Sequence, residues 1–93
     1  MNDMSKEIIF RDGWTLDKGQ VSDYTAACAF DVIILGYKYG LKLEEFFHNS
    51  EMIGFEWRGT KQAVTDWYTY VSKYMTGESE EQRNATLQII ANK

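Results

Sequence analysis

Two kinds of apolar spacing occur along the chain. In short stretches apolar residues recur at about every second position, and in longer stretches they recur at every third or fourth position. The first short stretch, Ile8 to Leu16, contains an Asp12-Gly13 pair between two β-favouring runs. Asp-Gly is typical of two-residue hairpin turns, because glycine tolerates a positive φ. The pattern therefore predicts an N-terminal hairpin that turns at Asp12 and Gly13. A lone hairpin is marginal in water, so a helix or a third strand should cover it.

The next apolar stretch follows helical spacing. Ser22 or Asp23 can cap a helix whose apolar residues recur at steps of three and four. We predict this helix over 23–39, ended by Gly40, and we expect it to be central because apolar side chains occupy more than one of its faces. Residues 32–39 are also rich in β-branched and aromatic types, so a strand there is the alternative.

The middle of the chain combines a predicted short helix with a predicted strand. Residues 43–49 carry Glu44 and Glu45 near their N-terminal end, and acids are favoured at that end of a helix. Residues 52–58 alternate apolar and polar side chains at period two. We therefore expect a short helix over 43–49 and the third strand of the sheet over 52–58.

Two further helices are predicted in the last third of the chain. Thr60 can cap a helix with a continuous apolar stripe, which Gly77 ends. Ser79 opens a capping box at the start of a C-terminal helix that runs through Ile90. Residues 85–90 also alternate in polarity, so a closing strand is the alternative there.

The predicted order of elements indicates an α+β fold. Three to four helices should cover one face of a small antiparallel sheet, made of the N-terminal hairpin and the central strand. The 93 residues, 44% hydrophobic and 15% aromatic, suit a single domain over 1–93. Half of that length would be too short to bury an adequate core.

Charge and cysteine content restrict the class of function and the compartment. Fourteen acidic and ten basic residues give a formal net charge of −4, which disfavours direct binding to nucleic-acid phosphates. A single cysteine makes no internal disulfide. The longest apolar runs are too short for a membrane-spanning helix or a signal-peptide core. We expect a cytoplasmic protein without a membrane anchor.

The residues that could carry catalysis or bind a metal lack visible partners in the sequence. Cys28 lies in an alanine-rich run typical of a buried thiol, and His48, the single histidine, suits a helix end or the surface better than a metal site. Asp31 and Asp66 are single acids on otherwise apolar or aromatic helices, as structural aspartates often are. The glycines fit no nucleotide-binding motif. We expect no catalytic residues, no metal and no cofactor.

Aromatic residues exceed what one core stripe needs, and tyrosine and tryptophan often anchor protein interfaces. We therefore predict a small acidic protein-binding module, not an enzyme, that occludes a partner protein with a basic surface. Compact inhibitor or immunity proteins, such as phage-encoded ones directed at nucleic-acid-handling complexes, are an analogy of size and charge. The residues predicted to contact the partner are Glu44, Glu45, Trp57, Tyr70, Glu80 and Glu81.

Other functions stay open at this point. A pocket between the sheet and the helix over 60–76 could bind a small molecule or catalyse a reaction, with Asp31 or Asp66 as its polar group. A second copy of the chain could bury the central helix or the hairpin edge. A nucleic-acid interface would require six scattered basic residues to form one patch. These residues are Arg11, Lys18, Lys38, Lys42, Arg58 and Lys61.

Overall fold

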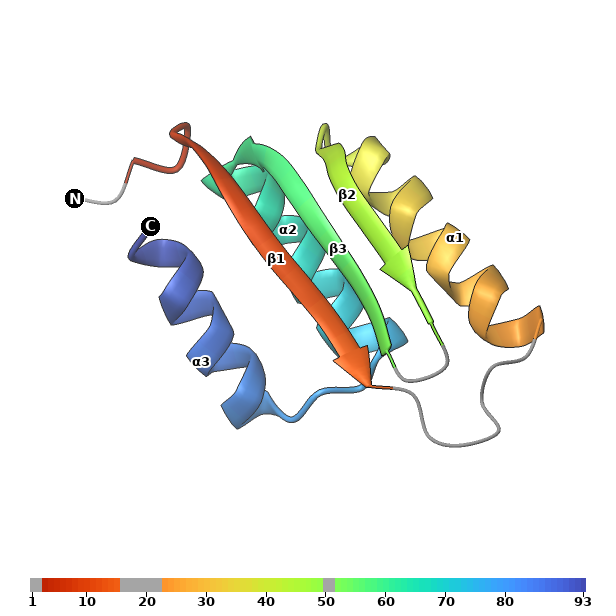
Figure 1. The fold of residues 1–93 in the computed structure, drawn as a ribbon. Helices are drawn as coiled ribbons and strands as arrows, with labels where there is room; N and C mark the ends of the chain where they lie inside the picture. The colour runs from red at the N-terminus through yellow and green to blue at the C-terminus, as the bar shows by residue number, and fades with distance from the viewer. Residues whose placement is uncertain (1–2, 16–22, 50–51) are drawn as a thin grey trace.

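One antiparallel sheet and the helices on one of its faces make up the molecule (Figure 1). The structure, a computed structural model, describes residues 3–15, 23–49 and 52–93, and at 14–15 and 23–29 it describes the backbone path alone. The strands are β1 (Glu7–Thr15), β2 (Lys42–His48) and β3 (Met52–Thr60). The helices are α1 (Asp23–Lys38), α2 (Lys61–Tyr70), which continues as the π-helix η1 (Val71–Met75), and α3 (Glu80–Ala91).

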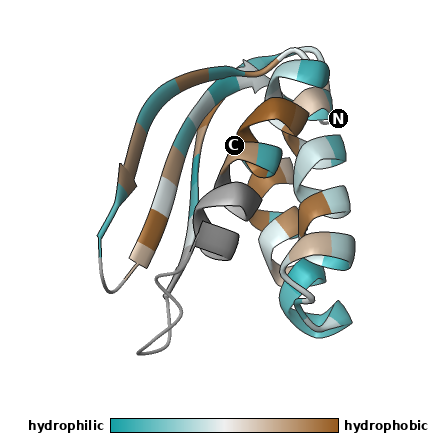
Figure 2. Cartoon of the chain, turned by 90° about the vertical axis from the view of Figure 1, so that its right-hand side faces the viewer, coloured by the Kyte–Doolittle hydropathy of each residue, from teal (hydrophilic) through white to brown (hydrophobic). Residues whose placement is uncertain are grey.

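β3 is the central strand of the sheet, whose order is β1-β3-β2. Both outer strands pair with β3 in antiparallel fashion, so β1 and β2 run parallel to each other and are linked through α1. Figure 2 shows that the helices all lie on the same side of the sheet. We call the helix-covered side the inner face and the opposite side the outer face.

The predicted hairpin at Asp12 and Gly13 is wrong, because β1 runs straight through both residues. Gly13 pairs with Gly54 of β3. A Cβ atom at position 13 would lie 2.5 Å from the carbonyl oxygen of Ile53. The glycine thus permits a close approach of two strands and does not form a turn. The α+β class is confirmed, but the sheet is not built from an N-terminal hairpin.

The short helix predicted over 43–49 is also wrong, because this segment forms the edge strand β2. Its pairing with β3 has an irregularity between Leu43 and Glu45, which leaves Glu44 as an extra residue. Such a bulge breaks the alternation by which a strand is recognised in a sequence. The third strand expected over 52–58 is confirmed as β3.

Both predicted helix starts in the last third of the chain are confirmed. The hydroxyl of Thr60 accepts a hydrogen bond from the backbone N–H of Ala63 at 3.0 Å. The hydroxyl of Ser79 accepts one from the N–H of Gln82 at 3.1 Å. Each cap pairs a backbone donor that the first turn of a helix leaves unsatisfied.

The helix ends also agree with the sequence. Gly40 follows α1 with a φ of 84°, and Gly77 follows η1 with a φ of 67°, values that favour glycine. The strand alternatives are both wrong, because 32–38 lies in α1 and 85–90 lies in α3. One detail was not expected: the last turn of the helix after Thr60 is a π-helix.

Aromatic side chains fill the space between the inner face and the helices. Trp57 of β3 and Trp67 of α2 are both 0% exposed, with ring centroids 5.4 Å apart. Phe10 of β1 meets Trp67 and Tyr68 edge to face. The indole N–H of Trp67 donates to the carbonyl of Val32 at 3.2 Å, which ties α2 to α1. Since these side chains fill the region between the sheet and α2, the alternative pocket predicted there gains no support.

Lys61, the first residue of α2, is 4% exposed and reaches the end of another helix. Its Nζ donates to the carbonyl of Ala91 in the last turn of α3, at 2.8 Å. A cation there pairs a carbonyl that the helix leaves free and lies at the negative end of the helix dipole. We expect Lys61→Met to lower the free energy of unfolding by about 1–2 kcal/mol, because that carbonyl loses its donor.

Urea denaturation followed by circular dichroism measures this loss. Lys73→Met is the matched control, because it removes the same charge from an exposed position on η1. Equal stability of the Lys61→Met variant and the parent protein would contradict the capping role of Lys61.

Candidate protein-binding surface

Charged side chains form a first row across the three strands of the outer face. Arg58 of β3 lies between acids on both neighbouring strands. Its Nε donates to Glu44 of β2 at 2.9 Å, and its Nη1 donates to Glu7 of β1 at 3.3 Å. Lys42 lies 4.0 Å from the same carboxylate of Glu44. Pairs of opposite charge across neighbouring strands stabilise the sheet and hold these side chains in place.

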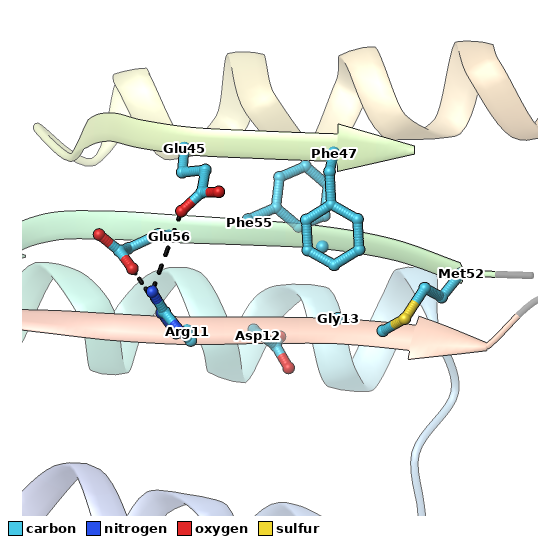
Figure 3. A pocket seen from close by; sticks show the side chains of 9 residues that line it. Arg11, Asp12, Gly13, Glu45, Phe47, Met52, Phe55 and Glu56 are labelled. Atoms are coloured by element: carbon cyan, nitrogen blue, oxygen red, sulfur yellow. Dashed lines mark hydrogen bonds and ion pairs between the residues drawn. The ribbon is translucent and has the colours of Figure 1, made fainter. Parts of the chain in front are cut away.

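A second charged row crosses the outer face one step further along the strands. Arg11 of β1 donates a hydrogen bond to Glu56 of β3 and forms an ion pair with Glu45 of β2 (Figure 3). The distance from Arg11 Nη2 to Glu45 is 3.9 Å, and the Glu45 side chain is 62% exposed. Glu45 is therefore the loosely held acid of this row and faces solvent.

Beside the second row, the outer face has a hollow where two neighbouring strands carry no side chains. Gly13 and Gly54 lie opposite each other and form its floor. A Cβ at Gly54 would lie 2.2 Å from a ring carbon of Phe47, so this ring occupies the space of the missing side chain. In Figure 3 the ring of Phe47 lies over β3, and the side chain of Met52 reaches from the start of β3 towards β1 beyond Gly13. The hollow has a volume of about 510 Å³.

The lining of the hollow determines what it can accept. Phe47 and Met52 are 42% and 37% exposed and offer an aromatic ring and a thioether. At one end lie the carboxylates of Glu45 and Glu56 with the single guanidinium of Arg11, which leaves one negative charge in excess. An apolar trough that ends in a carboxylate suits a lysine or arginine side chain, with an apolar stem and a cationic head.

Asp12 lines the hollow, but the alternation of β1 directs its side chain to the inner face. Burial there raises the pKa of the carboxyl from 3.8 to about 6, the N–H of Gly13 opposes this by hydrogen bonding, and the charge of Glu78 adds to the rise. The hydroxyl of Tyr68 donates to Glu78, and burial is the main cause that raises the pKa of Tyr68 to about 12. The charged form of Asp12 is thus disfavoured beneath the hollow.

Two of the six residues predicted for partner binding lie on the outer face. Glu44 and Glu45 are neighbours on β2, and both pair with arginines of the outer face. Trp57 is 0% exposed at the centre of the core, so its side chain offers no surface to a partner.

The other three predicted contact residues lie elsewhere in the fold. Tyr70 is 42% exposed on α2, with its ring 5.0 Å from that of Tyr74. Glu80 and Glu81 begin α3, on the far side of β1 from β2 (Figure 1). They lie in the first turn of that helix, where the dipole favours acids.

The single acids and the histidine that we considered for chemistry lie at the surface. Asp31, Asp66 and His48 are exposed, and Asp66 accepts a hydrogen bond from the side chain of Gln62 at 2.9 Å. The side chain of Cys28 lies outside the described residues. Within the described part of the chain, no group of three or more His, Cys, Asp or Glu side chains could hold a metal ion.

The basic residues considered for a nucleic-acid interface do not lie free on one patch. Arg11 and Arg58 are paired with carboxylates on the outer face, and Lys61 is buried. Lys18 lies outside the described residues. The structure therefore gives the nucleic-acid hypothesis no support.

A second exposed apolar surface lies on α1, the helix that the sequence predicted to be central or to be buried by a second copy of the chain. Phe30, Ile34 and Tyr37 are 66%, 52% and 55% exposed, and we call them the α1 strip. Their spacing of four and three residues places them along one side of the helix. The sequence left open whether this helix is buried within the chain or by a second copy, because periodicity alone does not distinguish a buried side from an exposed one.

No helix among the described residues has the length and apolar character needed to cross a membrane. The chain matches no protein-family model, no curated protein and no solved structure.

Proposed function

We propose that this chain is a small protein-binding module that covers part of a partner protein with the outer face of its sheet. The hollow above Gly13 and Gly54 is the observation that carries this proposal. Phe47 supplies an aromatic wall and Glu45 an exposed carboxylate, so the hollow accepts one long basic side chain. The partner is a protein that presents lysine or arginine at its surface.

The rest of the outer face supports binding by a preformed surface. Apart from the loosely held Glu45, its charged side chains are already paired, so little of their freedom is lost when a partner binds. Ile9 adds an exposed apolar side chain, 42% accessible, on the same face. The excess of acidic residues speeds the approach of a basic partner more than it tightens the complex. The charged residues of this face are Glu7, Glu44, Glu45 and Glu56 against Arg11, Lys42 and Arg58.

Occlusion is the mode of action that follows from such a surface. A sheet face that binds a basic region of another protein covers that region. Surfaces that bind nucleic acid are basic, because they neutralise phosphates. An inhibitor or immunity-type protein directed at a nucleic-acid-handling complex is therefore the class of binding module that we propose, in preference to an enzyme.

Paired affinity purification from the source cells tests this function. We expect tagged Glu45→Lys protein to recover about tenfold less of a nuclease-resistant partner than the parent protein, because like charges then face each other at the hollow. Glu81→Lys is the matched control, because it makes the same change in net charge on α3. It should recover the partner as the parent does.

Circular dichroism establishes that each variant is folded, and quantitative mass spectrometry compares the recovered proteins. A partner that Glu45→Lys retains in full would contradict binding at the hollow. Loss of the partner from Glu81→Lys alone would place the contact at the start of α3.

A further inference from the structure

We infer that the α1 strip is a self-association surface, on which a second copy of the chain packs antiparallel across a two-fold axis close to Ile34. This inference goes beyond the proposed function, because it uses a different face. The hollow lies on the outer face, whereas α1 lies on the inner side, next to the edge strand β2 (Figure 1). The two surfaces can be occupied at the same time.

The described part of α1 has two apolar sides, and the fold buries only one of them. Val32 is 1% exposed, and Gly36 packs against the ring of Trp57. At about 100° per residue, Ile34 lies on nearly the opposite side of the helix from Val32 and Gly36. Phe30 and Tyr37 lie to either end of Ile34, and Tyr37 turns far enough round the helix for its ring to reach Trp57. A helix with apolar residues on both sides normally has a second partner, because exposed apolar strips of this kind mark contacts with another molecule.

Two charged residues indicate that this partner is another copy of the chain. Asp31 and Lys38 are both exposed, and no ion pair joins either of them to another described residue. They lie seven residues apart, which is two helical turns, so both occupy the same flank of the α1 strip, one towards each end.

Antiparallel packing about Ile34 brings these opposite charges together. Asp31 lies three residues before Ile34 and Lys38 four residues after it, so Asp31 of one copy lies beside Lys38 of the partner subunit. The two-fold axis generates the same pair again at the other end of the helix. Flanking charges of this type select the orientation of paired helices. The strip is therefore complementary to itself in charge as well as in polarity.

The neighbouring side chains define the extent of the contact. Tyr37 is held in place by an edge-to-face contact with Trp57, with ring centroids 6.1 Å apart. Phe46 of β2, 41% exposed, packs against Phe55 with ring centroids 5.4 Å apart, on the side of the sheet that carries α1. A few large side chains from each copy bury less than the roughly 1,200 Å² of a standard interface. We therefore expect a reversible dimer with a dissociation constant on the order of 0.1 mM.

Sedimentation equilibrium of the full chain, from about 10 μM to about 1 mM, tests the dimer. Ile34→Glu should abolish association, because it places two carboxylates at the axis. Asp31→Lys and Lys38→Asp should each weaken it about tenfold, and the double variant Asp31→Lys/Lys38→Asp should restore it. Tyr74→Glu is the matched control, because Tyr74 is also an exposed aromatic, 66% accessible, but on η1.

Three results would overturn the inference. A parent protein that stays monomeric at about 1 mM has no such dimer. Association that survives Ile34→Glu uses another surface. If Asp31→Lys and Lys38→Asp each weaken the dimer and the double variant does not restore it, the antiparallel arrangement is excluded. Failure here leaves the partner test of Glu45→Lys unaffected, and the monomeric Ile34→Glu variant should still recover the protein partner if the outer face alone binds it.

Discussion

Replacement of Gly36 by alanine is expected to lower the free energy of unfolding by about 2–3 kcal/mol. This reverses the usual result, because alanine inside a helix is normally about 1 kcal/mol more favourable than glycine. A Cβ atom at position 36 would lie 2.4 Å from Cη2 of Trp57. Both residues are buried, and α1 would have to move away from β3 to relieve this contact.

A double-mutant cycle tests the cause of this loss. Trp57→Phe removes the second ring, whose Cη2, Cζ2 and Cζ3 atoms are the ones that the new Cβ meets. The indole Nε1 of Trp57 is buried without a hydrogen-bond partner among the described residues. Replacing Trp57 by phenylalanine therefore removes no hydrogen bond to these residues. In the Trp57→Phe background, Gly36→Ala should cost at least about 1 kcal/mol less. If Gly36→Ala stabilises the parent protein, α1 does not pack this closely on β3.

The helices could be predicted from the sequence because their signals are local. Thr60 and Ser79 each cap a helix through a backbone N–H three residues further on. Gly40 and Gly77 end helices because their own φ values are positive. None of these interactions depends on a residue distant in the sequence, so a single pass along the chain finds them.

The strands were harder to predict because their pairing is not local. The Asp12-Gly13 dipeptide has the composition of a turn. Gly13 instead lies within β1, where the missing side chain allows close contact with Gly54 of β3. In β2 the bulge at Glu44 interrupts the alternation that would have indicated a strand. Glu44 instead reaches Arg58, an interaction that only the register of the sheet reveals.

The candidate site could be anticipated only in part. Glu45 was selected for its charge, and it does lie at the rim of the hollow. The floor of the hollow exists because register places Gly13 opposite Gly54, and no sequence pattern contains that information. Trp57 was selected as an interface aromatic and is a core residue instead, because composition does not separate the two roles.

The buried acid below the hollow should produce the other large effect on stability. At about pH 8, we expect Asp12→Asn to raise the free energy of unfolding by up to about 3 kcal/mol. Burial raises the pKa of the Asp12 carboxyl from 3.8 to about 6, which means that the folded protein holds the charged form at a cost. Asparagine has nearly the same shape and carries no charge at any pH.

The sign of the pH dependence follows from that raised pKa. Below pH 3.8 the carboxyl is protonated in both the folded and the unfolded state, so it costs nothing. Between 3.8 and about 6 the unfolded chain ionises first, and the folded state loses stability as pH rises. Above about 6 both states are ionised and the loss is constant. The gain in free energy of unfolding from Asp12→Asn should therefore develop between pH 3.8 and about 6 and stay constant at higher pH.

Urea denaturation of both proteins, from about pH 4 to about pH 8, measures this curve. Asp66→Asn is the control, because it neutralises an exposed acid whose carboxylate accepts a hydrogen bond from Gln62 on the same helix. Its effect on the free energy of unfolding should be small, because the side chain is exposed. If the Asp12→Asn difference were equally large at about pH 4, it would reflect side-chain packing, because no charge remains on Asp12 there to be relieved. A variant less stable than the parent at about pH 8 would show that the charged carboxylate is favourable in the fold, as expected if a cation of the folded protein reaches it.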